Sequence, residues 1–168
     1  MTIAEAPEVA VDTLQVLTFD LDGETFALEA GVVREVLDAT VGTEVPGSPA
    51  FVGAVINFRG RIIPLADLRV AFGLDRWADN IDSRVVVIEY DLDGDPTLIG
   101  LRTDKVHEVT EIATADVEAA PRVGLRWRSD FIRGLARRDG DLIVLPDLDQ
   151  IFLTRGGAVG AVVPLAPS

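Results

Sequence analysis

Residues 51–72 read FVGAVINFRGRIIPLADLRVAF, and residues 131–152 read FIRGLARRDGDLIVLPDLDQIF. At a constant offset of 80 residues the two stretches share the identical pairs Phe51/Phe131, Gly60/Gly140, Ile63/Ile143, Leu65/Leu145, Asp67/Asp147, Leu68/Leu148 and Phe72/Phe152. One structural unit therefore occurs twice in this sequence. The two copies differ in charge at their central turn, where the first has Arg59 and Arg61 and the second has Asp139 and Asp141.

A second pair of similar stretches precedes the first. LDGETFALEAGVVREV at 21–36 resembles LDGDPTLIGLRTDKVHEV at 92–109 once two extra residues are allowed in the later turn. This alignment places Leu28, Val33, Glu35 and Val36 on Leu101, Val106, Glu108 and Val109. Because the parts occur in the same order twice, we infer two repeats, at about residues 15–72 and 84–152, joined by the polar linker GLDRWADNIDS.

Each repeat reads as short strands joined by tight turns. Apolar residues alternate on both sides of the Asp-Gly dipeptide at 22–23, which is a strong hairpin signal. Gly60 and Gly140 supply the permissive backbone that the later turns need. Asp67 and Asp147 each precede a short apolar segment, so we expect them to cap helices of one to two turns.

The spacing of these signals predicts the fold class. About five short strands per repeat, with turn signals every eight to twelve residues or so, are typical of a small barrel or sandwich. We therefore expect an all-β chain made of two small barrels with short helices. The expected organisation is a flexible tail at residues 1–14, a first barrel at 15–80, a second barrel at 81–155 and a tail at 156–168, with exchange of strands between the barrels left open.

The composition excludes several classes of function. With 28 acidic and 15 basic residues the net charge is -13, which repels phosphate backbones and anionic lipid. Cysteine is absent, so there is no disulfide framework and no thiolate site. The N-terminal stretch carries acids where a secretory signal needs positive charge, and no apolar run is long enough to span a bilayer. We expect a cytoplasmic protein that inserts into no membrane and binds no nucleic acid.

No arrangement of residues predicts catalysis. The single histidine, His107, lies in an alternating strand pattern, and the single lysine, Lys105, lies outside any phosphate-binding loop motif. The acidic run at 91–95 lacks the glutamate that would complete a calcium loop. Carboxylate pairs of the glycosidase kind stay possible among so many acids, but a solvated acidic surface explains them better. We therefore predict no enzyme activity, no metal and no cofactor.

The turn at Arg59 and Gly60 is the strongest candidate for a site. On one interpretation Arg59 pairs with a surface acid, which contributes under about 1 kcal/mol. On the other, the guanidinium presents a planar set of donors to a protein partner from a rigid turn. The opposite charge of Asp139 at the equivalent turn favours the second interpretation, because a duplicated scaffold differs where its two copies serve different partners.

A longer pattern resembles the CheW family of chemotaxis coupling proteins. The residues that carry the resemblance are FAL and VREV at 26–36, VPGSPAFVGAVINFRGRIIPLADLR at 45–69, FGL at 72–74, LRTDKVHEV at 101–109 and FIRGLARRDGDLIVLPDLD at 131–149. The likeness covers about residues 15–153, and the block at 45–68 is its most specific part. Pro146 departs from the pattern, since the family usually has an aliphatic residue there.

The resemblance implies two five-stranded SH3-like barrels packed together with a groove between them. It also implies a non-enzymatic adaptor of a two-component system, which joins the cytoplasmic tips of methyl-accepting chemotaxis receptors to the regulatory domain of the histidine kinase CheA. By similarity, the expected receptor-binding residues are Val33, Glu35, Arg59 and Val109. The expected kinase-binding residues are Val85, Val86 and Val106.

Two alternatives belong to other classes. A regulatory module of another kinase pathway would have the same fold, although this chain starts with Met and carries no upstream ATP-binding or phosphoacceptor segment. A barrel that binds a small ligand is the second alternative, and a thermal-shift screen against metabolites separates it from an adaptor.

Overall fold

The computed structural model describes residues 12–38, 42–74, 80–92, 94–121 and 129–154, and it contains two six-stranded sheets. One sheet has the order β3-β7-β8-β6-β5-β4 and is called barrel I here; the other has the order β10-β11-β12-β2-β1-β9 and is called barrel II. The strands of barrel I are β3 (Val33–Asp38), β4 (Thr43–Glu44), β5 (Ala54–Phe58), β6 (Arg61–Ala66), β7 (Arg84–Leu92) and β8 (Asp95–Thr103). Those of barrel II are β1 (Thr13–Leu21), β2 (Glu24–Glu29), β9 (Lys105–Ala113), β10 (Val117–Glu118), β11 (Ile132–Arg138) and β12 (Asp141–Pro146).

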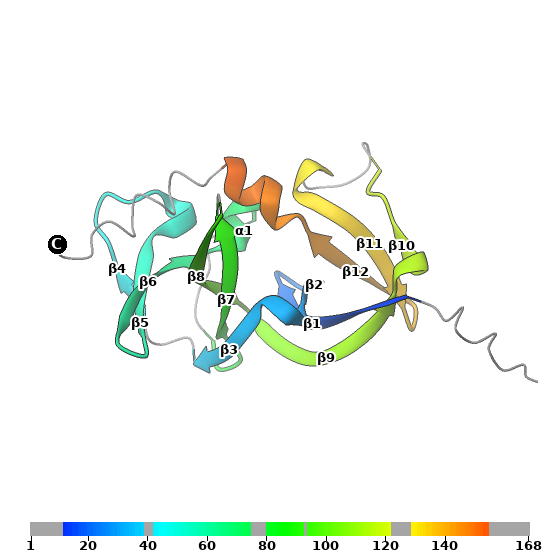
Figure 1. Cartoon of the computed structure of the whole chain (residues 1–168), viewed down its shortest axis with the longest axis horizontal. Coiled ribbons are helices and arrows are strands. Elements are labelled where there is room, and N and C mark those ends of the chain that lie inside the picture. Colours follow the sequence, from blue (N-terminus) through cyan, green and yellow to red (C-terminus); the bar gives the residue numbers. More distant parts are fainter. Residues whose placement is uncertain (1–11, 39–41, 75–79, 93, 122–128, 155–168) are drawn as a thin grey trace, which may run out of the picture.

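Both sheets close in the same way. The first and last strands of each order are neighbours in the chain, β3 with β4 and β9 with β10, so each of these pairs acts as one strand of a five-stranded barrel. Figure 1 shows the two barrels side by side along the long axis of the molecule. The prediction of an all-β fold with two five-stranded barrels is confirmed.

Each barrel contains a hairpin from the other repeat. The β1–β2 hairpin pairs with β9 and β12 of the later repeat, from Thr13 opposite Ala113 to Asp20 opposite Lys105 along β9. The β7–β8 hairpin likewise pairs with β3 and β6 of the earlier repeat. The expected division between residues 80 and 81 therefore separates the repeats in the sequence and does not separate the barrels.

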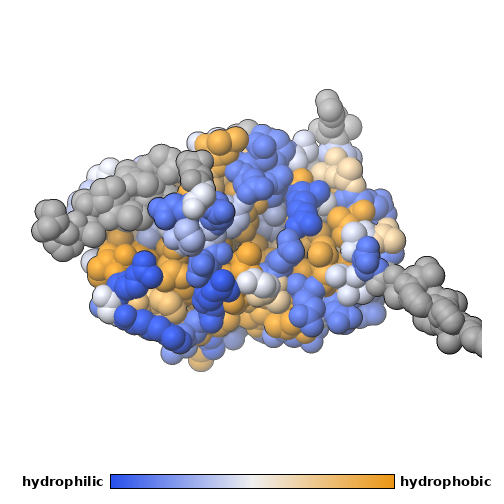
Figure 2. Space-filling view, viewed as in Figure 1, coloured by the Kyte–Doolittle hydropathy of each residue, from blue (hydrophilic) through white to orange (hydrophobic). Residues whose placement is uncertain are grey.

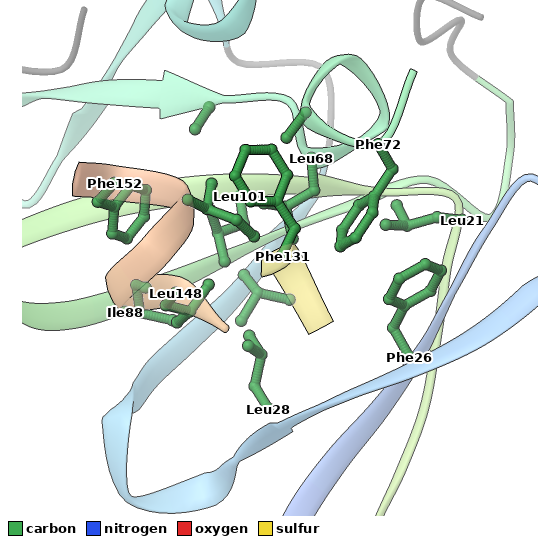
Figure 3. Packing of buried hydrophobic residues seen from close by; sticks show 14 of the residues in the cluster. Leu21, Phe26, Leu28, Leu68, Phe72, Ile88, Leu101, Phe131, Leu148 and Phe152 are labelled. Carbon is green, nitrogen blue, oxygen red and sulfur yellow. The ribbon is translucent and has the colours of Figure 1, made fainter. Parts of the chain in front are cut away.

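Three apolar clusters hold this arrangement together. Small clusters fill the two barrels, seven residues around Ile56 in barrel I and six around Ile143 in barrel II. The largest cluster lies between the barrels and contains Phe26, Phe72 and Phe131, whose rings Figure 3 shows converging from different elements. Burying one such side chain contributes about 2–3 kcal/mol, so this shared core joins the barrels into one body.

The strand β7 shows how the shared core depends on sequence. Its residues Val85 and Val87 point into barrel I, while Val86 and Ile88 point into the core between the barrels. All four side chains are fully buried. A strand with two buried faces needs a continuous apolar run, which is what RVVVIEY provides.

Short helices and tight turns complete the barrels, as predicted. Helix α1 (Leu68–Ala71) begins after Asp67, whose Oδ1 accepts a hydrogen bond from the Arg69 N–H at 3.0 Å. A second helix, at residues 148–154, lies over the junction of the barrels in Figure 1. There Asp147 Oδ1 accepts from the Gln150 N–H at 3.0 Å. The one-turn helices are η2 (Ala30–Val32), η4 (Ala50–Val52), η5 (Thr114–Asp116) and η6 (Ser129–Phe131).

None of the helices in the described part of the chain combines the length and the apolar character needed to cross a membrane.

Candidate functional site

Arg59 lies at the tip of the β5–β6 hairpin, in a rigid turn. Its φ is +54° and that of Gly60 is +82°, which is the left-handed pair that a two-residue hairpin turn requires. The Asn57 Oδ1 accepts a hydrogen bond from the Gly60 N–H at 3.0 Å. A left-handed φ costs a residue with a Cβ about 1 kcal/mol, and asparagine or aspartate tolerates it better than arginine. The turn is therefore well fixed, although arginine is a poor choice for it.

The guanidinium of Arg59 is held by two neighbours. Its Nη2 lies 2.5 Å from Oε1 of Glu35 on β3, and its Cζ lies 5.2 Å from the centre of the Phe58 ring. The Arg59 side chain is nevertheless 74% exposed, whereas Phe58 is buried. An ion pair this exposed contributes little to stability, so its main physical effect is to limit where the guanidinium points.

Barrel II has an equivalent ion pair, shifted by one residue. Glu108, the counterpart of Glu35, lies 3.6 Å from Nη1 of Arg138. Arg138 belongs to strand β11, and the tip of that hairpin is Asp139, with φ +53°. In both barrels, therefore, a glutamate on an outermost strand of the sheet, β3 or β9, pairs with an arginine of the β5–β6 or β11–β12 hairpin. What distinguishes barrel I is that its arginine stands at the tip.

Exposed valines flank the space between the barrels. Val36 pairs with Val86 across β3 and β7, and Val109 pairs with Leu17 across β9 and β1. Directly paired residues lie on one face of a sheet, and both partners belong to the core between the barrels. Val36 and Val109 are 39% and 58% exposed, so they extend this apolar face to the surface.

Val33 and Val36 share that face because β3 contains a bulge. Val33 pairs with Ile88, and a register shift between Val33 and Glu35 then places Val36 on the same side. Val33 is half-buried and packs against the core between the barrels. Val36 was not among the predicted receptor-binding residues. Its alignment with Val109 in the repeats was the signal that could have identified it.

A pocket of about 460 Å³ lies at the junction of the barrels, and its lining includes Val32, which precedes Val33 in the chain. Its apolar lining includes Leu14, Leu28 and Val32. Two polar contacts border it: the ion pair of Arg133 with Glu29, at 2.7 Å, and a hydrogen bond from the Tyr90 hydroxyl to Asp149. On the face seen in Figure 2, apolar surface extends over both barrels and is interrupted by hydrophilic side chains. This surface suits a partner with an apolar stripe and a polar border.

Val85 and Val86, two of the expected kinase-binding residues, have buried side chains. Both are 0% exposed, and β7 is paired on one side with β3 and on the other with β8. Over residues 85–88 the strand therefore offers a partner neither side chains nor a free edge. The apolar run that suggested a docking strand is explained by burial on two faces.

Val106, the third expected kinase-binding residue, lies in a different setting. It is half-buried and lines an open hollow of about 600 Å³ on barrel II, together with Lys105 and Arg138. His107 borders the same hollow, with Nε2 2.9 Å from Oδ1 of Asp20. Among the described residues, no group of three or more acidic, histidine or cysteine side chains is arranged to hold a metal ion.

Comparison with known proteins gives one consistent family. The CheW-like domain model matches residues 15–155. The chemotaxis protein CheW of Rhizobium meliloti is 25% identical over 138 residues, which cover 82% of this chain and 86% of that protein. The chemotaxis protein CheW of Thermotoga maritima is 29% identical over 146 residues, covering 85% and 90%. The crystal structure of the scaffolding protein TtCheW from Thermoanaerobacter tengcongensis matches with a TM-score of 0.74 and 30% identity, over 90% of this chain and 93% of that one.

Proposed function

The chain belongs to the CheW family, and from this we propose that it is a chemotaxis scaffold that couples the cytoplasmic tips of chemoreceptors to the histidine kinase CheA. The observation that carries the proposal is the family match at residues 15–155, which spans both barrels and the junction between them. Such a scaffold has no catalytic activity of its own. It works in the cytoplasm, where the receptor tips and the kinase meet.

The receptor docks at the junction of the barrels. Val33, Val36 and Val109 supply an apolar surface there, and the pocket of about 460 Å³ lies at the same junction, lined by Val32. Receptor tips are helical, and an amphipathic helix binds by laying its apolar face on such a surface. Arg59, which is paired with Glu35, provides the polar part of the recognition, because charged hydrogen bonds fix the orientation of a partner.

The kinase docks on barrel II, around Val106. Among the three expected kinase contacts, Val106 is the one that lies at the surface. The hollow beside it is lined by the cations Lys105 and Arg138 and by the acids Glu108, Asp139 and Asp141. Arg138 is paired with Glu108, so this surface offers a kinase an apolar contact at Val106 with polar groups of both signs around it.

Reconstitution tests this proposal. Purified CheA and a receptor preparation are mixed with and without the protein, and kinase autophosphorylation is measured with labelled ATP. We expect the protein to raise receptor-dependent phosphorylation and to accept no phosphate itself. Val106→Glu should weaken kinase binding and leave receptor binding intact, while Ile81→Glu, at a 90% exposed position, serves as the control. An equal kinase response with and without the protein would contradict the proposal.

A further inference from the structure

The contacts of Arg59 point to a division of roles within the predicted receptor-binding residues. We propose that Glu35 and Phe58 are positioning residues, which hold the Arg59 guanidinium toward the receptor, and that Arg59 makes the polar contact. This inference rests on the proposed function. It differs from the expectation based on resemblance, which treats Glu35 as a receptor contact in its own right and gives Phe58 no role.

The guanidinium is the more exposed partner of the ion pair, and it has donors to spare. Arginine has five N–H donors, and among the described residues one acceptor is seen for them, Oε1 of Glu35, at 2.5 Å from Nη2. The Glu35 side chain is 35% exposed, and its strand is fixed by pairing with Val87 of β7. The carboxylate is thus the less exposed partner, and it stands on a backbone that the sheet holds in place. The exposed, donor-rich end of the pair belongs to Arg59.

Phe58 supports the guanidinium from the other side. Its ring lies 5.2 Å from Cζ of Arg59, within the range of a cation–π contact. The Phe58 side chain is 8% exposed and belongs to the cluster inside barrel I, so it has little surface to offer a partner. The ring is instead a platform that is set by the barrel core. Together with Glu35 it restricts a long side chain that would otherwise sample many rotamers.

Comparison with barrel II shows which part of this arrangement is common to both barrels and which part is specific to barrel I. In barrel II the equivalent acid, Glu108 on β9, pairs with Arg138, but the residue at the tip of the hairpin is Asp139. The acid is therefore part of the framework that both barrels share. Only in barrel I does the arginine of the pair stand at an exposed hairpin tip. We therefore assign the receptor contact to Arg59 and the positioning of its guanidinium to Glu35.

A double-mutant cycle tests this division. A chemoreceptor-tip fragment is titrated against wild type, Arg59→Ala, Glu35→Gln, Phe58→Leu, and the doubles of Arg59→Ala with each of the other two, at fixed salt. We expect about 10- to 100-fold weaker binding for Arg59→Ala, which is the loss of a charged hydrogen bond. Each positioning variant alone should lose about 3- to 10-fold, and neither should weaken binding further when Arg59 is already alanine.

The possible outcomes separate this inference from the proposed function. If Glu35→Gln weakens binding as much in the Arg59→Ala background as in wild type, Glu35 contacts the receptor directly and the inference is overturned. If Glu35→Gln and Phe58→Leu both bind the receptor tip as tightly as wild type, the inference is overturned as well. If the wild type does not bind the receptor tip, the proposed function itself fails. Glu108→Gln removes the matching acid of barrel II and should bind as wild type does, and circular dichroism checks that each variant is folded.

Discussion

At the scale of single residues, Arg59 is the least expected feature of the chain. In the part of the chain that the structure describes, three tight turns have a non-glycine residue with a left-handed φ at their first central position: Asp22 at +51°, Arg59 at +54° and Asp139 at +53°. Aspartate is one of the residues that tolerate this conformation, whereas arginine has no local reason to adopt it. An unfavourable backbone choice at an exposed position indicates selection for something other than the turn.

Replacing Arg59 with asparagine should therefore separate stability from function. Asparagine suits the left-handed φ better, and the lost ion pair is exposed, so we expect the free energy of unfolding to change by less than about 1 kcal/mol. Receptor binding should weaken by about 1–3 kcal/mol. Arg59→Lys should restore part of it, since lysine keeps the charge and loses the planar set of donors. Thermal melts and receptor titrations of the three proteins measure this, and equal receptor affinities would mean that Arg59 is only a surface charge.

At the scale of elements, β7 and β9 show what decides whether an apolar strand is core or surface. Val86 on β7 and Val109 on β9 both face the junction of the barrels, yet Val86 is 0% exposed and Val109 is 58% exposed. The difference is the position of the strand: β7 lies between two others, while β9 is the last strand in the order of barrel II.

The same substitution at these two valines should have opposite consequences. Val86→Glu places a carboxylate in the shared core, which should destabilise the fold by several kcal/mol, enough to unfold a marginally stable domain. Val109→Glu should leave the melting temperature near that of wild type and abolish most receptor binding. Circular dichroism melts and receptor titrations check both variants, with Ile81→Glu as a surface control. A folded Val86→Glu protein would contradict the burial that makes β7 a core strand.

Local signals in the sequence predicted local structure correctly. The turns at Asp22 and Arg59 and the caps at Asp67 and Asp147 each depend on a few adjacent residues. The candidate site was harder to predict because it depends on distant pairing. Leu17 and Val109 are directly paired although they are far apart in the chain, and no local pattern encodes that contact. The bulge in β3, which turns Val36 toward the junction, is equally invisible in the alternation of apolar residues.

At the scale of the whole molecule, exchange of hairpins makes the two barrels interdependent. Barrel I needs β7 and β8 from the later repeat, and barrel II needs β1 and β2 from the earlier one. The shared core contains residues from both repeats, such as Phe26 and Phe131. The proposed receptor and kinase surfaces therefore sit on one body, so the distance between them is fixed by packing. For a scaffold, that fixed distance is what allows one partner to be held in a defined place relative to the other.

This interdependence predicts how fragments of the chain behave. Residues 1–80 contain β3–β6 without the hairpin that fills the gap between β3 and β6, and residues 81–168 lack the hairpin that lies between β9 and β12. Each fragment alone would expose an open sheet and half of the shared core, so neither should fold as a monomer. Mixed or co-expressed, the two fragments should assemble into a one-to-one complex, because the missing hairpins are supplied in trans. Circular dichroism and light scattering of each fragment and of the mixture measure this. A monomeric fragment with a cooperative melt would show that one repeat can close a barrel without the other.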